Sequence, residues 1–230
     1  KILIPKVISY GSFKDKAWLV SEYKSGITLK DKRKEGFDLS VIADDLADTL
    51  YKIHNSSNYS KYGWITDNCV LDNDTFIDFL NSELRRFNDG IKDSVDDDDL
   101  EYMKKQAQDA LKVIKKYSSQ YKPQLLWFDL NPSNILIKDD RLEAIIDAGG
   151  AKYGIKEWDL AFLRCETCIN EKEYSAICEA YRKIDNSLNL QVIEALSVFV
   201  ELDDMIIRIL DKTKLPIPYC TVFEEIIRKY

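Results

Sequence analysis

Hydrophobic and polar positions alternate with two different periods along the chain. Residues 3–10 and 17–23 are short runs rich in β-branched and aromatic side chains, and the polar stretch 11–16 separates them. This pattern is typical of a β-hairpin with the polar stretch as its loop. Gly26 and the charged run 30–35 then interrupt the pattern, and we interpret its Lys-rich part, 30–34, as a solvated loop.

Three helices are indicated next by apolar residues that recur at intervals of three and four. We expect them from Asp38 to about residue 53, from Thr75 to Asn88, and from the acidic run 96–99, as a solvated first turn, to residue 114. Asp38 is placed to cap the first helix, and the acidic run suits the positive end of the third helix dipole. The apolar faces consist of Leu39, Ile42, Leu46, Leu50 and Ile53, then Phe76, Phe79, Leu80, Leu84 and Phe87, and finally Leu100, Met103, Ala107, Leu111 and Ile114.

The second half of the chain combines short strands with further helices. Apolar runs at 125–128, 134–137 and 143–147 are broken by turn residues and predict a small β-structure. From Trp158 the pattern is helical almost to the end, and 190–210 is its longest apolar-rich stretch. The predicted fold class is therefore α+β: a hairpin, helices, a short β segment rich in Asp and Asn, and more helices.

Composition and charge narrow the classes of protein that fit. The sequence has 230 residues, which suits one large domain or two small lobes. A formal net charge of −7 argues against general nucleic-acid binding, which requires a basic surface. No apolar run is long enough for a membrane span, and the single histidine, His54, excludes His-rich metal sites. Five scattered cysteines are typical of a reducing compartment, so we predict a cytoplasmic location.

Acidic and amide side chains are concentrated between residues 125 and 163. Asp129 and Asn134 flank a turn that the intervening Pro-Ser pair favours, and Asp147 precedes two glycines that allow close approach of a ligand. Taken alone, Asp129 and Asn134 could be ordinary turn residues. Together with Asp147 they form an all-oxygen set, which suits Mg²⁺ bound to phosphate oxygens and is poor for zinc.

The order of these residues resembles the catalytic and metal-binding loops of the protein-kinase-like fold, in which D-x-x-x-x-N precedes a strand, a turn, a strand and D-x-G. This form of the motif is similar to that of the aminoglycoside phosphotransferase family of small-molecule kinases. In that family the pattern is H-G-D-L-H-P-x-N, then I-D-W-x, then D-L-A. The matching positions here are 127–134, 146–149 and 159–161. Residues 18–26 are similar to the last strand and hinge of the family's N-terminal lobe.

The resemblance implies a role for each residue of the pattern. Asp129 would accept the proton of the attacking substrate hydroxyl, Asn134 and Asp147 would hold Mg²⁺ on the β- and γ-phosphates of ATP or GTP, and Asp159 would be structural, bracing the catalytic loop. The nucleotide base would lie against the backbone of Ser21, Glu22 and Tyr23 and the side chains of Leu136 and Ile146.

Four further acids, Glu166, Glu201, Asp203 and Asp204, are weaker candidates for substrate binding. They follow Asp159 in the region where, in this family, C-terminal helices wall the substrate cleft and acids bind cationic sugars. Most acids in such positions are ordinary surface charges.

The resemblance implies a two-lobed fold with a mostly helical C-terminal lobe. Residues 1–24 would be the remnant of the N-terminal lobe and the hinge, and 25–230 the C-terminal lobe, with catalytic loop 127–134 and metal loop 147–150. The family's glycine-rich phosphate loop, strand lysine and partner glutamate have no counterpart here, so we expect most of the N-terminal lobe to be missing from this sequence.

The catalytic loop also departs from the family pattern. Trp127 and Phe128 stand where the family has histidine and glycine, and Asn131 replaces the second histidine. The packing behind Asp129 must therefore differ from that of the family.

Two functions are consistent with these features. The first is Mg²⁺-dependent transfer of the γ-phosphate of ATP or GTP to a hydroxyl of a small molecule, such as an aminoglycoside or another cationic amino-alcohol. The alternative is a non-catalytic kinase-like binding module or an inactive fragment, which the altered loop and the lack of a phosphate clamp suggest. We expect no nucleic-acid or membrane partner, and the sequence leaves the oligomeric state open.

Overall fold

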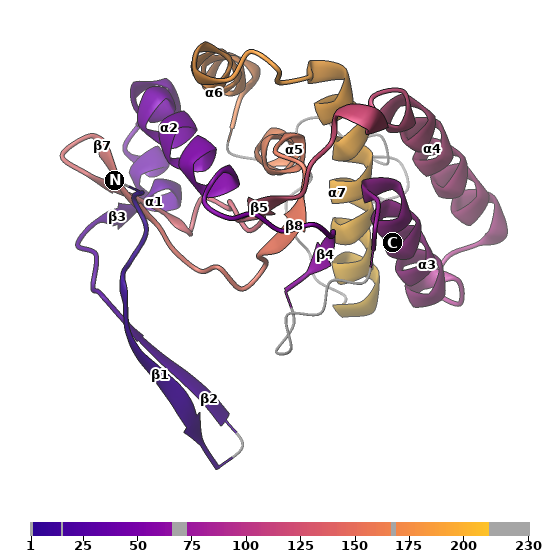
Figure 1. Cartoon of the computed structure of the whole chain (residues 1–230), viewed down its shortest axis with the longest axis horizontal. Helices are drawn as coiled ribbons and strands as arrows, with labels where there is room; N and C mark the ends of the chain where they lie inside the picture. The colour runs from indigo at the N-terminus through magenta and orange to yellow at the C-terminus, as the bar shows by residue number, and fades with distance from the viewer. Residues whose placement is uncertain (1, 15, 66–72, 167–168, 212–230) are drawn as a thin grey trace.

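The computed structural model of the chain describes residues 2–14, 16–65, 73–166 and 169–211 (Figure 1). Its strands are β1 Val7–Phe13, β2 Lys16–Ser21, β3 Ile27–Thr28, β4 Gly63–Trp64, β5 Gln124–Leu126, β6 Ile135–Lys138, β7 Arg141–Ile145 and β8 Lys152–Gly154. Its helices are α1 Leu29–Lys34, α2 Ala43–His54, α3 Phe76–Ile91, α4 Asp97–Lys115, α5 Glu157–Cys165, α6 Glu171–Ile184 and α7 Leu190–Asp211, with 3-10 turns at Leu39–Ile42 and Ser118–Gln120.

The predicted helix starts are confirmed at their capping residues. Thr75 accepts a hydrogen bond from the Asp78 N–H at the start of α3, and Asp96 accepts one from the Asp99 N–H at the start of α4. Asp38 caps as expected, but the element it opens is the 3-10 turn, and α2 begins only at Ala43. Side-chain caps of this kind satisfy amide groups that the first helical turn leaves without partners.

The Lys-rich residues 30–34 are helical, so their interpretation as a solvated loop was wrong. Thr28 caps α1 by accepting from the Asp31 N–H, and Leu29 is fully buried at its first position. Arg33 of α1 forms an ion pair with the buried Glu173 of α6. A buried leucine and two long-range ion pairs, Arg33 with Glu173 and Lys32 with Asp140, hold the helix, and none of them produces an apolar period in the sequence.

Strands β1 and β2 form the predicted antiparallel hairpin, but its turn is shorter than the polar stretch suggested. The paired register runs to Phe13 opposite Lys16, so most of residues 11–16 belong to the strands. Gly11 lies opposite Trp18, and a Cβ at Gly11 would lie 2.6 Å from the indole ring. The hairpin projects from the rest of the molecule (Figure 1), and many of its apolar side chains are exposed.

Two small sheets carry the loops rich in Asp and Asn. The predicted strands β6 and β7 pair with each other, and β3 joins the edge of β6. The second sheet has the order β4-β8-β5, with both neighbours antiparallel to β8. Strands β3, β4 and β8 were not predicted, because each has only two or three residues and none lies in a longer apolar run.

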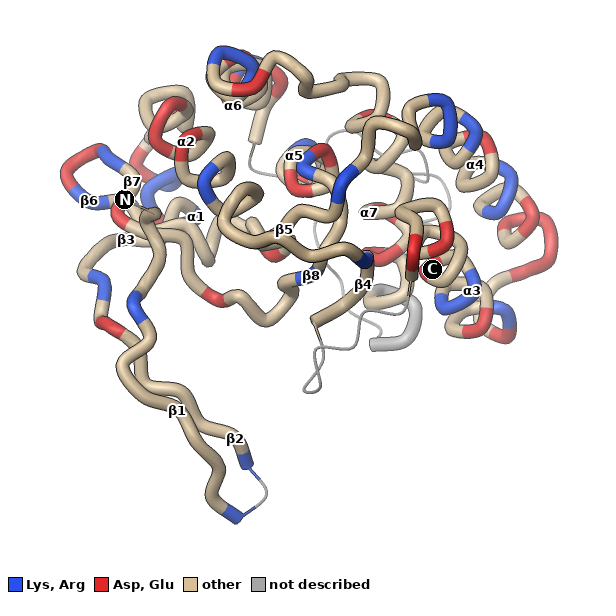
Figure 2. The backbone as a smooth tube through the Cα atoms, viewed as in Figure 1, with Lys and Arg blue, Asp and Glu red and all other residues tan. Residues whose placement is uncertain are grey.

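Helix α7 packs against α5 on one side and against α3 and α4 on another, while α2 packs against α6 (Figure 1). The buried face of α7 continues the apolar core through Val192, Ile193, Leu196, Phe199, Leu202 and Met205. Lys, Arg, Asp and Glu are spread along the outer helices α3, α4 and α6 (Figure 2). None of the helices in the described ranges is long and apolar enough to cross a membrane.

Glu173 connects α6 with α1 and with the 3-10 turn at Leu39, so its removal is a sharp test of the fold. It is 1 % exposed, completes the capping box of α6 with Asn170, and accepts from the Leu39 N–H at 2.8 Å. We expect Glu173→Ala to lower the free energy of unfolding by about 3–5 kcal/mol, because Arg33 and the buried Leu39 N–H lose their partner and α6 loses its capping box. Urea unfolding monitored by circular dichroism measures this loss. The exposed Glu179→Ala in the same helix should change stability by less than about 0.5 kcal/mol; equal midpoints for the two variants would contradict this account.

Candidate active site

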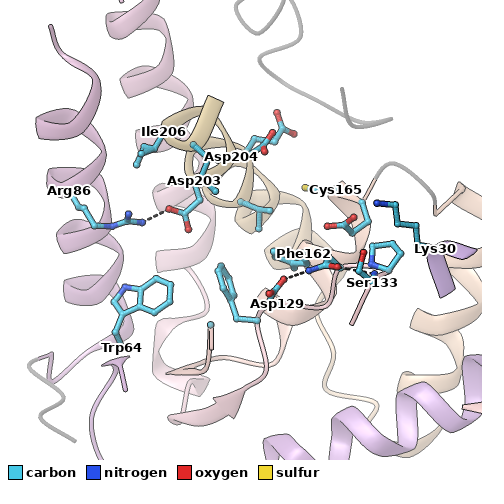
Figure 3. Close-up of a pocket in the computed structure, with 18 residues that line it drawn as sticks. Lys30, Trp64, Arg86, Asp129, Ser133, Phe162, Cys165, Asp203, Asp204 and Ile206 are labelled. Atoms are coloured by element: carbon cyan, nitrogen blue, oxygen red, sulfur yellow. Dashed lines mark hydrogen bonds and ion pairs between the residues drawn. The ribbon is translucent and has the colours of Figure 1, made fainter. Parts of the chain in front are cut away.

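A cleft of about 740 Å³ opens beside the turn that follows β5 (Figure 3). It is bounded by β4, α3, the end of α5 and the C-terminal part of α7. Its lining includes Lys30, Trp64, Arg86, Phe128, Asp129, Asn131, Pro132, Ser133, Gly150, Phe162, Cys165, Glu166, Val200, Glu201, Asp203, Asp204, Ile206 and Ile207. The cleft therefore brings Asp129 together with all four acids expected at the substrate side.

Asp129 follows a tight and strained turn of the backbone. Its N–H donates to the Trp127 carbonyl at 2.9 Å, which closes a γ-turn with Phe128 at the centre. Phe128 has a φ of +65°, in the left-handed region where a bulky side chain is disfavoured by about 1–2 kcal/mol. The Asp129 carboxylate accepts a 2.6 Å hydrogen bond from Asn131, which fixes its orientation at the cleft wall (Figure 3).

A buried carboxylate holds this turn from behind. Asp159 of α5 is fully buried and accepts from the Trp127 N–H at 3.0 Å and the Phe128 N–H at 2.9 Å. His54, at the end of α2, lies 3.0 Å from the same carboxylate, and its other ring nitrogen lies 2.7 Å from the Tyr181 hydroxyl. Two helices and the loop thus meet at one carboxylate, which holds the two amides immediately before Asp129.

The loops of Asn134 and Asp147 lie side by side. The Ile146 N–H donates to the Asn134 carbonyl at 2.8 Å, and the Asn134 side-chain amide donates to the Asp129 carbonyl at 3.1 Å. Asp147 has a φ of +62° and is exposed. A Cβ on Gly150 would lie 3.4 Å from the Asp129 Cβ, which is ordinary van der Waals contact, so the two loops pack directly against each other.

The donor set of these two residues fits a magnesium ion that also binds phosphates. The amide nitrogen of Asn134 is committed to the Asp129 carbonyl, so its oxygen is the atom suited to a cation. The carboxylate of Asp147 is at the surface and supplies the charge. Among the described residues no group of three or more His, Cys, Asp or Glu could hold a metal ion. An ion at this place would therefore take its remaining ligands from phosphate oxygens and water, as Mg²⁺ does.

The residues expected to bind the nucleotide base come from two separate elements. Ser21 ends β2, and the Glu22 N–H already donates to the Lys6 carbonyl at 2.8 Å. Tyr23 is 87 % exposed.

The expected apolar contacts for the base lie closer to the body. Leu136 of β6 is buried, and Ile146 is half-buried beside the Asp147 loop. A Cβ on Gly26 would lie 3.2 Å from the Leu136 Cβ, so the chain after the hairpin passes directly over β6.

The four acids differ in their surroundings. Asp203 forms an ion pair with Arg86 of α3, which also pairs with Glu83 at 3.0 Å. Burial raises the pKa of Glu166 to about 7, and the nearby carboxylates of Asp129 and Asp204 add to the increase. Glu201 is 2 % exposed, and its carboxylate contributes to the negative charge around Cys165.

Several lining residues were missed from the sequence. The cleft is also lined by Trp64, Arg86 and Phe162. Lys152 lies behind this wall, with its nitrogen 4.1 Å from the Trp64 ring centre. Their positions depend on the packing of β4, α3 and α5 against each other. No local pattern around them distinguishes them from core or surface residues.

The fold is that of the kinase-like small-molecule phosphotransferases. Residues 1–187 match the model of the phosphotransferase enzyme family, and the chain belongs to that family. The mixed helix and sheet architecture is the kinase-like fold of the aminoglycoside phosphotransferases.

Solved structures with this fold include a thermostable mutant of aminoglycoside phosphotransferase APH(4)-Ia with AMP-PNP and hygromycin B. It is 18 % identical, with a TM-score of 0.66 over 90 % of this chain and 70 % of that one. The gentamicin complex of APH(2'')-IIa is 19 % identical, with a TM-score of 0.64 over 92 % of this chain and 70 % of that one. No curated protein sequence matched the chain significantly.

Replacing Asp159 tests directly whether its carboxylate holds the loop that precedes Asp129. In Asp159→Asn, one accepting oxygen becomes an amide group that faces a backbone N–H or His54. We expect the free energy of unfolding to fall by about 2–4 kcal/mol, because a buried donor is left without an acceptor. Denaturant unfolding measures this loss, with the exposed Asp44→Asn as the matched control. A loss no larger than that of the control would show that the carboxylate does not hold the loop.

Proposed function

We propose that this protein transfers the γ-phosphoryl group of a nucleoside triphosphate to a hydroxyl of a small molecule at the cleft beside Asp129. The observation that carries the proposal is the position of the Asp129 carboxylate. It lines the cleft on a loop held by Asp159, with the loop of Asp147 packed against it. This arrangement suits in-line phosphoryl transfer, in which catalysis consists of positioning and charge neutralisation.

Each residue has a distinct role in this proposal. Asp129 orients the attacking hydroxyl and accepts its proton, while Asn131 fixes the carboxylate through a 2.6 Å hydrogen bond. Asn134 and Asp147 would hold Mg²⁺, which would neutralise charge on the β- and γ-phosphates. Asp159 acts through the backbone of Trp127 and Phe128 and does not face the cleft.

The donor nucleotide would lie between the hairpin and β6. Ser21, Glu22 and Tyr23 would contact the base edge through backbone groups, and Leu136 and Ile146 would lie against its face. We propose ATP or GTP as the donor and residues 1–24 as part of the nucleotide-binding lobe, with 25–230 as the C-terminal lobe. AMP-PNP and ADP occupy solved structures of APH(4)-Ia with this fold, which supports a nucleotide donor.

A cationic hydroxyl-bearing substrate is favoured by the charge of the cleft. Glu166, Glu201 and Asp204 line the same cleft as Asp129, where an amine could form charge-assisted hydrogen bonds. Asp203 is a weaker candidate, because Arg86 already pairs with it. Hygromycin B and gentamicin are bound by the solved relatives, which supports an aminoglycoside or a similar amino-alcohol.

The competing function is a kinase-like binding module without catalysis. The observation that favours it is Phe128, a bulky residue in a left-handed conformation one position before Asp129. The turn is nevertheless formed, with both amides hydrogen-bonded, so the bulky side chain does not displace the Asp129 carboxylate from the cleft.

The transfer itself is tested by following labelled γ-phosphate from ATP and GTP to a panel of amino-alcohols. We expect Asp129→Asn to lower kcat by roughly 10²–10⁴-fold while leaving nucleotide affinity nearly unchanged, because a general base acts mainly in the transition state. The exposed Asp98→Asn is the matched control. Full turnover by the Asp129 variant would overturn the assignment.

The metal role of Asp147 is tested by nucleotide binding. Asparagine tolerates the left-handed backbone at this position, so Asp147→Asn should fold normally. At ten times the Kd, MgATP should raise the melting temperature of the wild type by roughly 3–6 °C. The variant should lose the part of this shift that depends on Mg²⁺. An identical MgATP titration of the two proteins would count against the role of Asp147.

The pKa of Glu166 predicts a pH dependence of substrate binding. With a pKa of about 7, the carboxyl gains its negative charge as the pH rises from 6 to 8. For a substrate whose amine stays protonated over this range, we expect KM to fall by roughly three- to tenfold. Steady-state kinetics across this range, with Glu166→Gln as the comparison, measure the effect. A KM that varies equally with pH in both proteins would exclude Glu166 from substrate binding.

A further inference from the structure

Lys152 of β8 is a buried lysine enclosed by aromatic rings. It has no exposed surface, and its nitrogen has no hydrogen-bond partner among the described residues. The nitrogen lies 3.1 Å from the ring centre of Phe128, 3.7 Å from that of Trp158 and 4.1 Å from that of Trp64. An ammonium ion at these distances is attracted to the negative faces of the rings.

The charged groups that act on Lys152 come from three helices. Asp203 of α7, Glu83 of α3 and Asp159 of α5 favour its charged form, and Arg86 of α3 opposes it. The carboxylates have other close partners: Arg86 for Asp203 and Glu83, and the loop amides for Asp159. Burial outweighs their attraction and lowers the pKa of Lys152 to about 7.

The closest ring belongs to Phe128, the residue at the centre of the strained γ-turn. A bulky residue persists in the left-handed region only where its surroundings hold it there. Asp159 holds the Phe128 backbone through its N–H at 2.9 Å. The ring packs edge-to-face with Trp158 at 5.5 Å, and Lys152 lies against the ring.

We propose that Lys152 is a positioning residue for Asp129: its ammonium group holds the ring of Phe128 and thereby maintains the turn that presents the Asp129 carboxylate to the cleft. The inference rests on the proposed function only in taking Asp129 as the reacting group. Phe128 and Trp64 also line the cleft, so Lys152 supports the wall that faces the substrate.

A purely structural side chain at this place would not need a charge. Replacing a buried ion by an apolar residue of similar size commonly leaves stability equal or higher. The native pKa of about 7 lies below the ordinary value of 10.5, so the native state binds fewer protons than the unfolded chain between these two pH values. The destabilisation is therefore complete below pH 7 and declines as the pH rises towards 10.5. Because the buried charge lowers stability, we infer that Lys152 contributes to the function of the adjacent site.

The test compares Lys152→Met with the wild type in stability and in turnover. We expect the melting temperature of the variant to be equal or higher, with the largest gain at pH 6 and the smallest at pH 9. We expect kcat to fall by roughly 10- to 100-fold, because the reacting group is misplaced, and KM for the nucleotide to stay unchanged. An unchanged kcat, or a parallel loss of kcat and stability, would overturn the positioning role.

A second readout does not depend on activity and separates this inference from the proposed function. Nuclear magnetic resonance follows the backbone amide of Asp129 from pH 6 to 8 in a Glu166→Gln background, which removes the Glu166 carboxyl as a source of a transition near pH 7. We expect a transition near pH 7 that disappears when Lys152→Met is added. A constant Asp129 resonance in the Glu166→Gln protein alone would refute the proposal, even if the methionine variant did not fold.

Lys156→Met is the matched control. Lys156 is 7 % exposed and is, like Lys152, a buried lysine, but it lies at the start of α5 and its nitrogen pairs with Asp185 and Ser187, which follow α6. This variant should lower the melting temperature and leave both kcat and the Asp129 transition unchanged. If Lys156→Met also abolished the pH transition of the Asp129 amide, the transition would not be specific to Lys152. That result would also overturn the assignment.

Discussion

One buried carboxylate organises the region around the catalytic loop. Asp159 accepts from two consecutive loop amides and lies beside His54, so α5, α2 and the loop share a single polar centre in an apolar core. Burying a carboxylate is unfavourable unless its oxygens are hydrogen-bonded. The loop therefore has little freedom to move without leaving this charge without partners. The strained turn at Phe128 and the orientation of Asp129 both follow from this constraint.

The altered catalytic loop is accommodated by an aromatic layer behind it. The Trp127 indole N–H donates to the Ile146 carbonyl at 3.1 Å, which ties the catalytic loop to the strand end before Asp147. Phe128 packs at near right angles to Trp64 and Trp158, with Lys152 between the rings. The residues that depart from the family pattern are thus connected to both functional loops, and the Asp129 carboxylate still lines the cleft.

The sequence was sufficient to predict long helices and the order of the functional loops. The apolar periods of α3 and α4, with caps at Thr75 and Asp96, are local signals, and so is the Asp129–Asn134 turn. Helix α1 was missed because it depends on one buried leucine and on ion pairs with distant residues, such as Glu173, which is 140 positions from its partner Arg33. Trp64, Arg86 and Lys152 could not be predicted, because their roles arise only when β4, α3 and β8 pack together. The charge of Asp203 was visible, but its neutralisation by Arg86 was not.

The central claim is that Asp159 fixes the two amides that precede Asp129. Hydrogen exchange of the backbone amides in the native protein, followed by nuclear magnetic resonance, tests it most directly. The Trp127 and Phe128 amides lie outside helices and strands but donate to a fully buried acceptor. The account predicts that both exchange as slowly as the amides of the buried helix α5. Exchange at the rate of exposed loop amides would contradict it.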